Sequence, residues 1–376
     1  MKKLRVSIAL MLALACFFAL SACAKKDNTP SGGADLSKVY QFGFNTWGTA
    51  PNLMIYGDEC QYGIDSIGMK GSRSSDDNNA DKELQNIQNF IAAGVNGLCV
   101  QAAGSTTAPQ MATEALNAKI PFVLYVFTGT PEFRDDLAAN NAYYYGACAP
   151  DLDKDGYILG QQAIKDGCTK ACIIGGNIGD LNMDRRQSGF TNAFTEGGGT
   201  VLDVARCTDN SEALTKASAM LSANKDVDCV YIMAGDFAPG MLNAIDTLQL
   251  PNVKAYLSSI DKNSAQYIRD GQITVGSGGT ALSCNIAPAL LLNALDGHPI
   301  KDSDGKPPYF QIPTSLVTKD NVDAFVDAFF GDTKAVSQDV IKNLCYRYNP
   351  NVTYQTFVDT INNDLTIDAI IKSHSK

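Results

Sequence analysis

Three aspartates in one short run have the spacing of a metal-binding loop. The run DLDKDGYI (151–158) matches the first eight positions of the calcium loop D-x-D-x-D-G-x-I. The twelfth position, where such a loop needs a bidentate glutamate, is Gln162, and a neutral amide supplies one oxygen in place of two. We therefore expect these acids to begin a helix, where negative charge is favourable, and we predict no metal site.

Other arrangements that support catalysis or nucleotide binding are missing. The glycine runs GGNIGD (175–180) and GSGGT (276–280) lack the Lys-Ser/Thr of a P-loop and the spacing of a dinucleotide fingerprint. The two histidines, His298 and His374, lie in a turn and at the C-terminal end, so a histidine-based catalytic set is not expected. No CxxC pattern or Cys/His cluster has zinc-site spacing. Without a nucleophile–base pair, we predict a protein that is not an enzyme and needs no cofactor.

From residue 38 onward, strand-like and helix-like segments alternate along the chain. In ADKELQNIQNFIAAG (80–94), Leu84, Ile87, Phe90 and Ile91 recur three to four positions apart, as on one face of a helix. Such β-α units with apolar strands indicate parallel sheets covered by helices on both faces. The strands are predicted at 39–44, 97–102, 121–127, 143–149, 171–176, 200–207, 228–233, 254–259 and 273–277, and the helices at 80–93, 107–118, 156–166, 185–196, 211–223, 238–248 and 262–270.

The order of these segments resembles the type I periplasmic binding proteins, the ribose- and galactose-binding receptors of ABC transporters. The resemblance covers about 38–300 and is carried by NNADKELQNIQNFIAAGVNGLCVQ (78–101), AKIPFVLYVF (118–127), DLDKDGYILGQ (151–161), RRQSGFTNAF (185–194), VDCVYIMAGDFAPGMLNAI (227–245) and YIRDGQI (267–273). It implies two similar α/β lobes, each a parallel sheet flanked by helices, joined by three crossings near 149–152, 276–281 and 307–312. The N-terminal lobe would comprise 38–150 plus 280–309, and the C-terminal lobe 151–279 plus 310–376.

Ligands of such sheets bind beyond the carboxyl ends of the strands, which selects four residues of the N-terminal lobe. Asn45 and Trp47 follow the first strand, where the family places an asparagine and ring-stacking aromatics; the alternative for Trp47, the only tryptophan, is a plug that packs its loop onto the core. Gln101 matches a ligand-contacting asparagine of the family, although it could equally brace the loop. Phe127 and its neighbour Val126 replace the family's Asp-Arg pair, which leaves an apolar wall. Phe127 either stacks on the ligand or ends its strand's core.

Four residues of the C-terminal lobe complete the expected ligand-binding set. Arg186 matches the family's arginine, with Arg185 as the competing candidate, and a guanidinium suits vicinal hydroxyls. Asp151 matches a family aspartate at the first crossing. Asp236 lies in a binding loop of the family but could instead cap the following helix. Ser259, or Ser258 beside it, replaces a family aspartate.

The first 37 residues predict export and a lipid anchor. MKKLRVSIALMLALACFFALSAC (1–23) has a basic end, an apolar run and small residues before a cysteine. Its last four residues resemble a lipobox, in which a signal peptide (1–22) is removed and lipid is attached to Cys23; an ordinary signal peptide is the alternative. Residues 23–37 form a polar tether. Removal of 1–22 takes away three positive charges and changes the net charge from −10 to −13. So acidic a protein is not expected to bind nucleic acid.

Nine cysteines follow Cys23, an odd number that cannot pair completely within one chain. Cys99, Cys148, Cys172 and Cys229 lie in apolar strand-like runs, where we expect free thiols buried as small hydrophobic side chains. Cys168 and Cys172 could alternatively form a bridge.

The resemblance implies an extracytoplasmic, lipid-anchored monomer that captures a small polar ligand, most simply a sugar, and delivers it to a membrane ABC permease. The alternative is a binding protein whose liganded form is read by a membrane receptor or sensor kinase.

Overall fold

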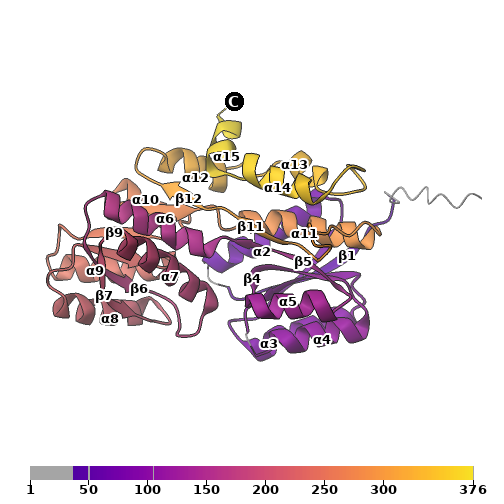
Figure 1. The fold of residues 1–376 in the computed structure, drawn as a ribbon, viewed down its shortest axis with the longest axis horizontal. Coiled ribbons are helices and arrows are strands. Elements are labelled where there is room, and N and C mark those ends of the chain that lie inside the picture. The colour runs from indigo at the N-terminus through magenta and orange to yellow at the C-terminus, as the bar shows by residue number, and fades with distance from the viewer. Residues whose placement is uncertain (1–36, 50, 105, 376) are drawn as a thin grey trace, which may run out of the picture. The chain divides into compact units, whose positions relative to one another are not determined.

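Two six-stranded sheets form the framework of the chain (Figure 1). The computed structural model describes residues 37–49, 51–104 and 106–375, so the expected signal peptide, Cys23 and nearly all of the tether lie outside the described residues. The first sheet has the order β11-β5-β4-β3-β1-β2, and all of its neighbouring strands are parallel. Its strands are β1 (Gln41–Thr46), β2 (Lys70–Ser75), β3 (Gly97–Ala102), β4 (Phe122–Thr128), β5 (Tyr144–Pro150) and β11 (Tyr309–Ile312).

The second sheet has the order β12-β10-β9-β8-β6-β7. Its pairs are parallel except for β12, which runs antiparallel to β10 at the edge. The two sheets and their helices confirm the expected α/β fold with two similar lobes. The strands are β6 (Lys170–Ile174), β7 (Thr200–Ala205), β8 (Cys229–Ile232), β9 (Lys254–Leu257), β10 (Val275–Gly278) and β12 (Ser315–Val317).

Several helices that flank the sheets begin at a capping side chain, and α3 shows how such a helix buries one face. In α3, the Asn79 side chain accepts from the Lys82 N–H, and Ile87 and Phe90 are buried against the first sheet's core. The helices of the first lobe are α2 (Pro51–Ser66), α3 (Ala80–Ala92), α4 (Ala108–Ala118), α5 (Pro131–Asn140) and α11 (Leu282–Leu295); those of the second are α6 (Leu152–Lys165), α7 (Leu181–Glu196), α8 (Asn210–Ala223), η1 (Gly235–Phe237), α9 (Ala238–Thr247) and α10 (Ala265–Arg269).

Five elements of the first lobe were not predicted, namely β2, β11, α2, α5 and α11, and three of them have weak sequence signals. Strand β2 reads KGSRSS and lies at the sheet edge, so it has no alternating apolar pattern. Helix α2 combines polar and apolar residues without a clear stripe. Helix α11 is apolar on nearly every side because it is buried, and this removes the helical periodicity.

The chain passes between the sheets three times, after β5, β10 and β11. The β11 passage lies later than expected, because β11 stays paired with β5 as far as Ile312 and β12 begins at Ser315 in the other sheet. The first and third passages adjoin each other, since the Asp151 N–H donates to the Ile312 carbonyl at 2.9 Å.

The segment after β12 packs against both lobes, which differs from the expected assignment of 310–376 to the second lobe. Val322 and Phe325 join the second lobe's core, whereas Ile341, Phe357 and Ile361 join the first lobe's core. In Figure 1 these helices run past both sheets on one side. Hydrophobic contacts therefore tie the C-terminal segment to both lobes. Its helices are α12 (Val322–Phe330), α13 (Gln338–Asn343), α14 (Tyr354–Asn363) and α15 (Ile367–His374).

Arg347, between α13 and α14, fastens the start of the described chain to this segment. Its guanidinium forms a two-pronged ion pair with Asp296, and its Nη1 donates to the Lys38 carbonyl at 2.9 Å. The side chains of Arg347 and Asp296 are 1% and 2% exposed. A buried fork of this kind fixes the geometry of the three segments that it joins.

All nine cysteines of the described residues are buried, free thiols, and this includes Cys168 and Cys172. No helix in the described part of the chain is long and apolar enough to span a bilayer.

Candidate functional site

Two cavities lie at the carboxyl ends of the strands. The first, which we call the tryptophan cavity, has a volume of about 440 Å³ and is lined by Trp47 and Phe127 of the first lobe and by Asn177, Arg185 and Asp236 of the second. The other, the tail cavity, has about 390 Å³ and is lined by α2, the loop after β9 and the C-terminal segment. Both volumes are within the range of small-molecule pockets.

Trp47 lies just beyond the end of β1 and is held by its backbone. Its N–H donates to Gln101 Oε1 at 2.8 Å, and its carbonyl accepts from the Asn78 N–H at 2.7 Å. The side chain is half-buried and lines the tryptophan cavity. This arrangement leaves part of the indole available as an apolar platform for a ligand.

Asn45 and Gln101 support this loop and line neither cavity. The Asn45 amide donates to Asp76 Oδ2 and to the Gln101 carbonyl, and its Oδ1 accepts from the Gln101 N–H. Both side chains are completely buried. The structure thus gives Asn45 a bracing position between β1 and β3, and it places Gln101 behind Trp47.

Phe127 and Tyr56 form the wall between the two cavities. Their rings pack edge to face with centroids 6.3 Å apart; Phe127 lines the tryptophan cavity and Tyr56 the tail cavity. The Tyr56 hydroxyl bonds to Thr280 at the β10 passage, and burial raises its pKa while the charge of Arg186 opposes the rise. Tyr56 therefore brings α2 of the first lobe close to the buried arginine of the second.

Arg186 lies behind this wall with its guanidinium engaged by the second lobe. Nε donates to Asp155 at 3.0 Å, Nη1 donates to the Met233 carbonyl at 3.0 Å, and Nη2 bonds to the Ser259 hydroxyl. Desolvation lowers the pKa of Arg186, but Asp155 and its other neighbours outweigh that effect and raise it. Arg186 lines neither cavity, whereas Ser259 lines the tail cavity.

Arg185, the competing arginine, does line the tryptophan cavity. It is partly exposed, and both Nε and Nη2 donate to Asp153 Oδ2, at 2.9 and 2.7 Å. Nη1 lies 3.5 Å from the Tyr309 hydroxyl of the first lobe. This contact gives Arg185 a position at which both lobes meet.

The acidic run 151–158 forms the first two turns of α6 rather than a metal-binding loop. Asp151 is the N-cap and accepts from the Lys154 N–H at 3.2 Å, while Asp153 and Asp155 pair with Arg185 and Arg186. A calcium loop must wrap around its ion, and a helix cannot do so. Asp151 lines neither cavity.

The remaining polar lining of the tryptophan cavity comes from loops after β6 and β8. Asn177 and Asp180 belong to the glycine run 175–180, which turns at Gly176 (φ +60°) and Gly179 (φ +83°). Asp180 caps α7 by accepting from the Asn182 N–H at 2.9 Å. Asp236 lies in η1 and is exposed. Carboxylate and amide groups therefore face the aromatic side chains across the cavity.

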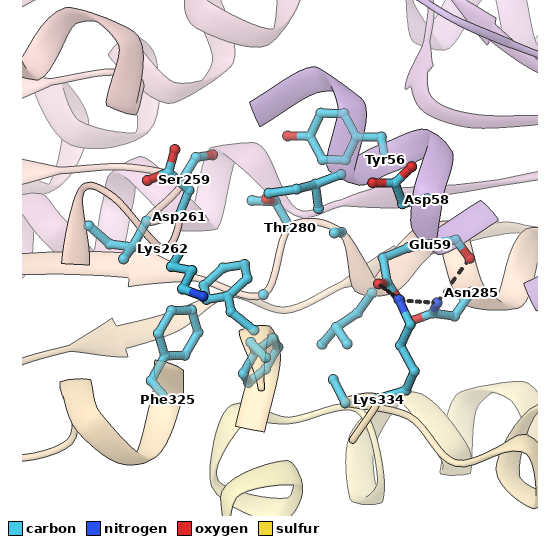
Figure 2. A pocket seen from close by; sticks show the side chains of 18 of the residues that line it. Tyr56, Asp58, Glu59, Ser259, Asp261, Lys262, Thr280, Asn285, Phe325 and Lys334 are labelled. Atoms are coloured by element: carbon cyan, nitrogen blue, oxygen red, sulfur yellow. Dashed lines mark hydrogen bonds and ion pairs between the residues drawn. The ribbon is translucent and has the colours of Figure 1, made fainter. Parts of the chain in front are cut away.

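The tail cavity combines aromatic rings with paired charges (Figure 2). Glu59 accepts from Lys334 at 2.7 Å and from Asn285 Nδ2 at 2.8 Å, which joins α2, α11 and the C-terminal segment. Phe325 and Phe329 of α12 line the cavity with Tyr56. Of this lining, sequence reasoning selected Ser259 but missed Tyr56, Glu59 and the phenylalanines of α12, because α2 and the C-terminal helices had no assigned role. The rule that each parallel strand is followed by a helix could have located α2.

Comparisons with known proteins agree on one family and one fold. The model of the periplasmic binding protein domain matches residues 55–297. A periplasmic solute-binding protein of an ABC transporter from Actinobacillus succinogenes 130z, solved with bound D-allose, has 15% identity and a TM-score of 0.68, over 76% of this chain and 99% of that one. No curated protein sequence matches the chain.

Two further solved structures have the same fold. A glucose-galactose binding protein from Geobacillus stearothermophilus has 16% identity and a TM-score of 0.65, over 76% of this chain and 99% of that chain. A solute-binding protein of an ABC transporter from Bacillus halodurans C-125, with bound myo-inositol, has 17% identity and a TM-score of 0.66, over 79% of this chain and 99% of that chain. All of these identities are too low to show more than a shared fold.

Proposed function

Because the chain belongs to the periplasmic binding protein domain family, we propose that it captures a sugar or polyol in the tryptophan cavity and delivers it to an ABC importer. Its family and its structural neighbours are solute-binding proteins rather than enzymes.

The observation that supports this ligand class is the pairing of aromatic and polar surfaces across one cavity. Trp47 and Phe127 offer apolar ring faces, and Asn177, Arg185 and Asp236 offer amide, guanidinium and carboxylate groups. A pyranose or a cyclitol has the same two aspects, a C–H face and a rim of hydroxyls. Aromatic stacking binds the face, and charged donors and acceptors bind the rim with directional hydrogen bonds.

Lobe closure would complete the site. The loop of residues 175–180 carries Ile178, which is 88% exposed at the border of the tryptophan cavity. Movement of the second lobe toward the first would cover this side chain and Trp47 together, and burial of apolar surface favours closure. Sugars are bound by structural neighbours, including D-allose and arabinofuranose, and here the apolar wall at Phe127 favours a ring with an extended C–H face.

The family implies an extracytoplasmic location, and we extend this to a lipid-anchored monomer. The run LSAC (20–23) supports attachment of lipid at Cys23, and the tether 23–37 would let the protein reach a permease in the same membrane. Cys23→Ser should move the protein from the membrane fraction to the soluble fraction. Retention in the membrane fraction would contradict the anchor.

A ligand-stabilisation screen tests the proposed ligand class. The full-length protein is heated with hexoses, pentoses, inositols and nucleosides, each at high concentration. A ligand present at 100 times its Kd stabilises the folded state by about 2.7 kcal/mol, which is a shift of several degrees in Tm. We expect a sugar or polyol to give this shift, and Arg185→Ala to reduce it. Stabilisation by nucleosides alone would overturn the proposal.

A further inference from the structure

We propose that Cys168, Asp228 and Cys229 form a zinc-binding site at the amino ends of strands β6 and β8, on the side of the second sheet that is opposite the cavities. Each of the three residues offers one ligand atom, and these atoms all lie within 4.8 Å of one another. Among the described residues, this is the one group of at least three His, Cys, Asp or Glu side chains with that property. The proposal is independent of the ligand in the tryptophan cavity.

The fold brings these residues together from distant parts of the sequence. Cys168 precedes β6, Asp228 precedes β8, and Cys229 is the first residue of β8. The two strands are parallel neighbours, with Ala171 opposite Cys229, so their amino ends lie side by side. Sixty residues separate the two thiols, which explains why the spacing of cysteines along the chain gave no zinc signal.

The distances suit a tetrahedral ion. Zinc binds thiolate sulfur at about 2.3 Å, so two sulfurs on one tetrahedral zinc lie about 3.8 Å apart. The observed separation of at most 4.8 Å requires a movement of no more than about 1 Å, which side-chain rotation can supply. Two sulfurs and one carboxylate oxygen leave a fourth position for water.

Asp228 is oriented as a metal-binding carboxylate usually is. Its Oδ2 accepts from the Thr169 N–H and hydroxyl, each at 2.8 Å, and its Oδ1 accepts from the Lys170 N–H at 2.9 Å. A carboxylate offers about four lone-pair positions, so three hydrogen bonds leave room for an ion. Hydrogen bonds that fix a ligating carboxylate are a common feature of metal sites.

The site is shielded from solvent on the side of its two cysteines and accessible to solvent on the side of Asp228. Cys168 is 4% exposed and Cys229 is fully buried, whereas Asp228 is only partly buried and Thr169 is exposed. The Tyr256 hydroxyl lies 3.6 Å from Cys168 Sγ and donates to Asp166 Oδ2, which closes the inner side. An ion would enter past Asp228 and link the loop before β6 to β8.

Cobalt titration of the reduced, metal-free full-length protein tests the site, since Co²⁺ bound by thiolates absorbs strongly through sulfur-to-metal charge transfer. We expect one Co²⁺ per chain with this absorption, and its loss when one equivalent of Zn²⁺ is added. Cys168→Ser and Cys229→Ser should abolish the band, and Asp228→Asn should weaken zinc binding at least tenfold. Cys172→Ser changes a buried cysteine of β6 outside the cluster. This variant should retain the charge-transfer band and the wild-type affinity for zinc.

The wild-type protein alone can overturn the proposal. Absence of the charge-transfer band at saturating Co²⁺ would do so, and this result does not depend on whether a cysteine variant folds. A band that survives in both Cys168→Ser and Cys229→Ser would also overturn it. Recovery of Cys168 and Cys229 as a disulfide from protein kept with zinc would show that the pair is a redox couple instead.

Discussion

The side-chain oxygen of Gln101 accepts a hydrogen bond from the backbone N–H of Trp47 at 2.8 Å. This contact joins β3 to the loop after β1 and fixes the entry of that loop beside the tryptophan cavity. Gln101 is itself completely buried, so its effect on a ligand must pass through Trp47.

Gln101→Leu should weaken ligand binding without removing any ligand contact. The variant leaves the partly buried Trp47 N–H without its acceptor, and an unsatisfied donor costs up to about 1–3 kcal/mol when it is fully buried. We expect a lower Tm and a fall in affinity of about tenfold, because the indole is no longer held in one position. Calorimetric titration with the sugar found by screening measures the affinity. Gln85→Leu on the exposed face of α3 is the control, and equal affinities for the two variants would contradict the bracing role.

Trp47→Ala should bind ligand one to two decades more weakly while it remains folded. Stacking on one aromatic ring contributes about 0.5–1.5 kcal/mol beyond buried area, and the lost contact area adds to this. Because tenfold in affinity corresponds to about 1.4 kcal/mol, the sum reaches one to two decades. As the only tryptophan, Trp47 should also change its emission when ligand binds, under excitation that avoids tyrosine. Emission that ignores ligand, together with a large loss of stability in Trp47→Ala, would instead identify the residue as a plug for its loop.

The two adjacent arginines should give opposite results. Arg186→Met leaves Asp155, which is fully buried, without its ion-pair partner, and breaking a buried pair in this way costs about 3–5 kcal/mol of stability. Arg185→Met removes a partly exposed pair and should cost less than about 1 kcal/mol while lowering affinity for the sugar. Denaturant unfolding and calorimetric titration of both variants separate the roles. A stability loss in Arg185→Met as large as that in Arg186→Met would contradict the assignment.

Asp76 should make the protein less stable as the pH rises toward 7. Burial raises its pKa from 3.8 to about 6, although hydrogen bonds from Asn86 and Asn45 oppose the rise. The folded state therefore holds this proton more tightly than the unfolded state does, so the stabilisation is complete below about pH 4 and is lost as the pH passes 6.

The matched test compares unfolding free energies at pH 4.5 and pH 7.5. One pKa unit corresponds to 1.36 kcal/mol, so Asp76→Asn should reduce the pH-dependent loss by roughly 2 kcal/mol. Asp65→Asn, at an exposed position of α2, should leave the loss unchanged. An unchanged slope in Asp76→Asn would show that another group controls this transition.

Most of the alternating strands and helices between residues 80 and 277 were predictable because they carry a strong local signal. Strand β3 was located at its observed limits, since GLCVQA is apolar and its flanks are turn-forming. The roles of the loop residues were harder to predict. Asn45 and Trp47 are two positions apart, yet they have different roles. The side-chain amide of Asn45 forms hydrogen bonds only within the protein, whereas the ring of Trp47 lines a cavity.

The roles of the two arginines were equally hard to predict from the sequence. Arg185 and Arg186 are neighbours on one helix, and only the packing of α7 against α6 decides which of them is buried with Asp155. Tyr56 and the tail cavity depend on contacts between α2 and the C-terminal segment, which are more than 250 residues apart. No local pattern in the sequence encodes such a contact.

The ion pair of Arg347 has a mechanical consequence for the proposed membrane anchor. It clamps the Lys38 carbonyl to Asp296 and to the chain between α13 and α14, so any pull transmitted through the residues before Lys38 enters the body at this buried fork. Asp296 ends α11 of the first lobe, so such a load would reach the first lobe directly rather than through any of the three passages between the sheets. Under the proposed lipid anchor and lobe closure, thermal motion of the anchor would therefore pull on the first lobe and not directly on the passages that closure bends.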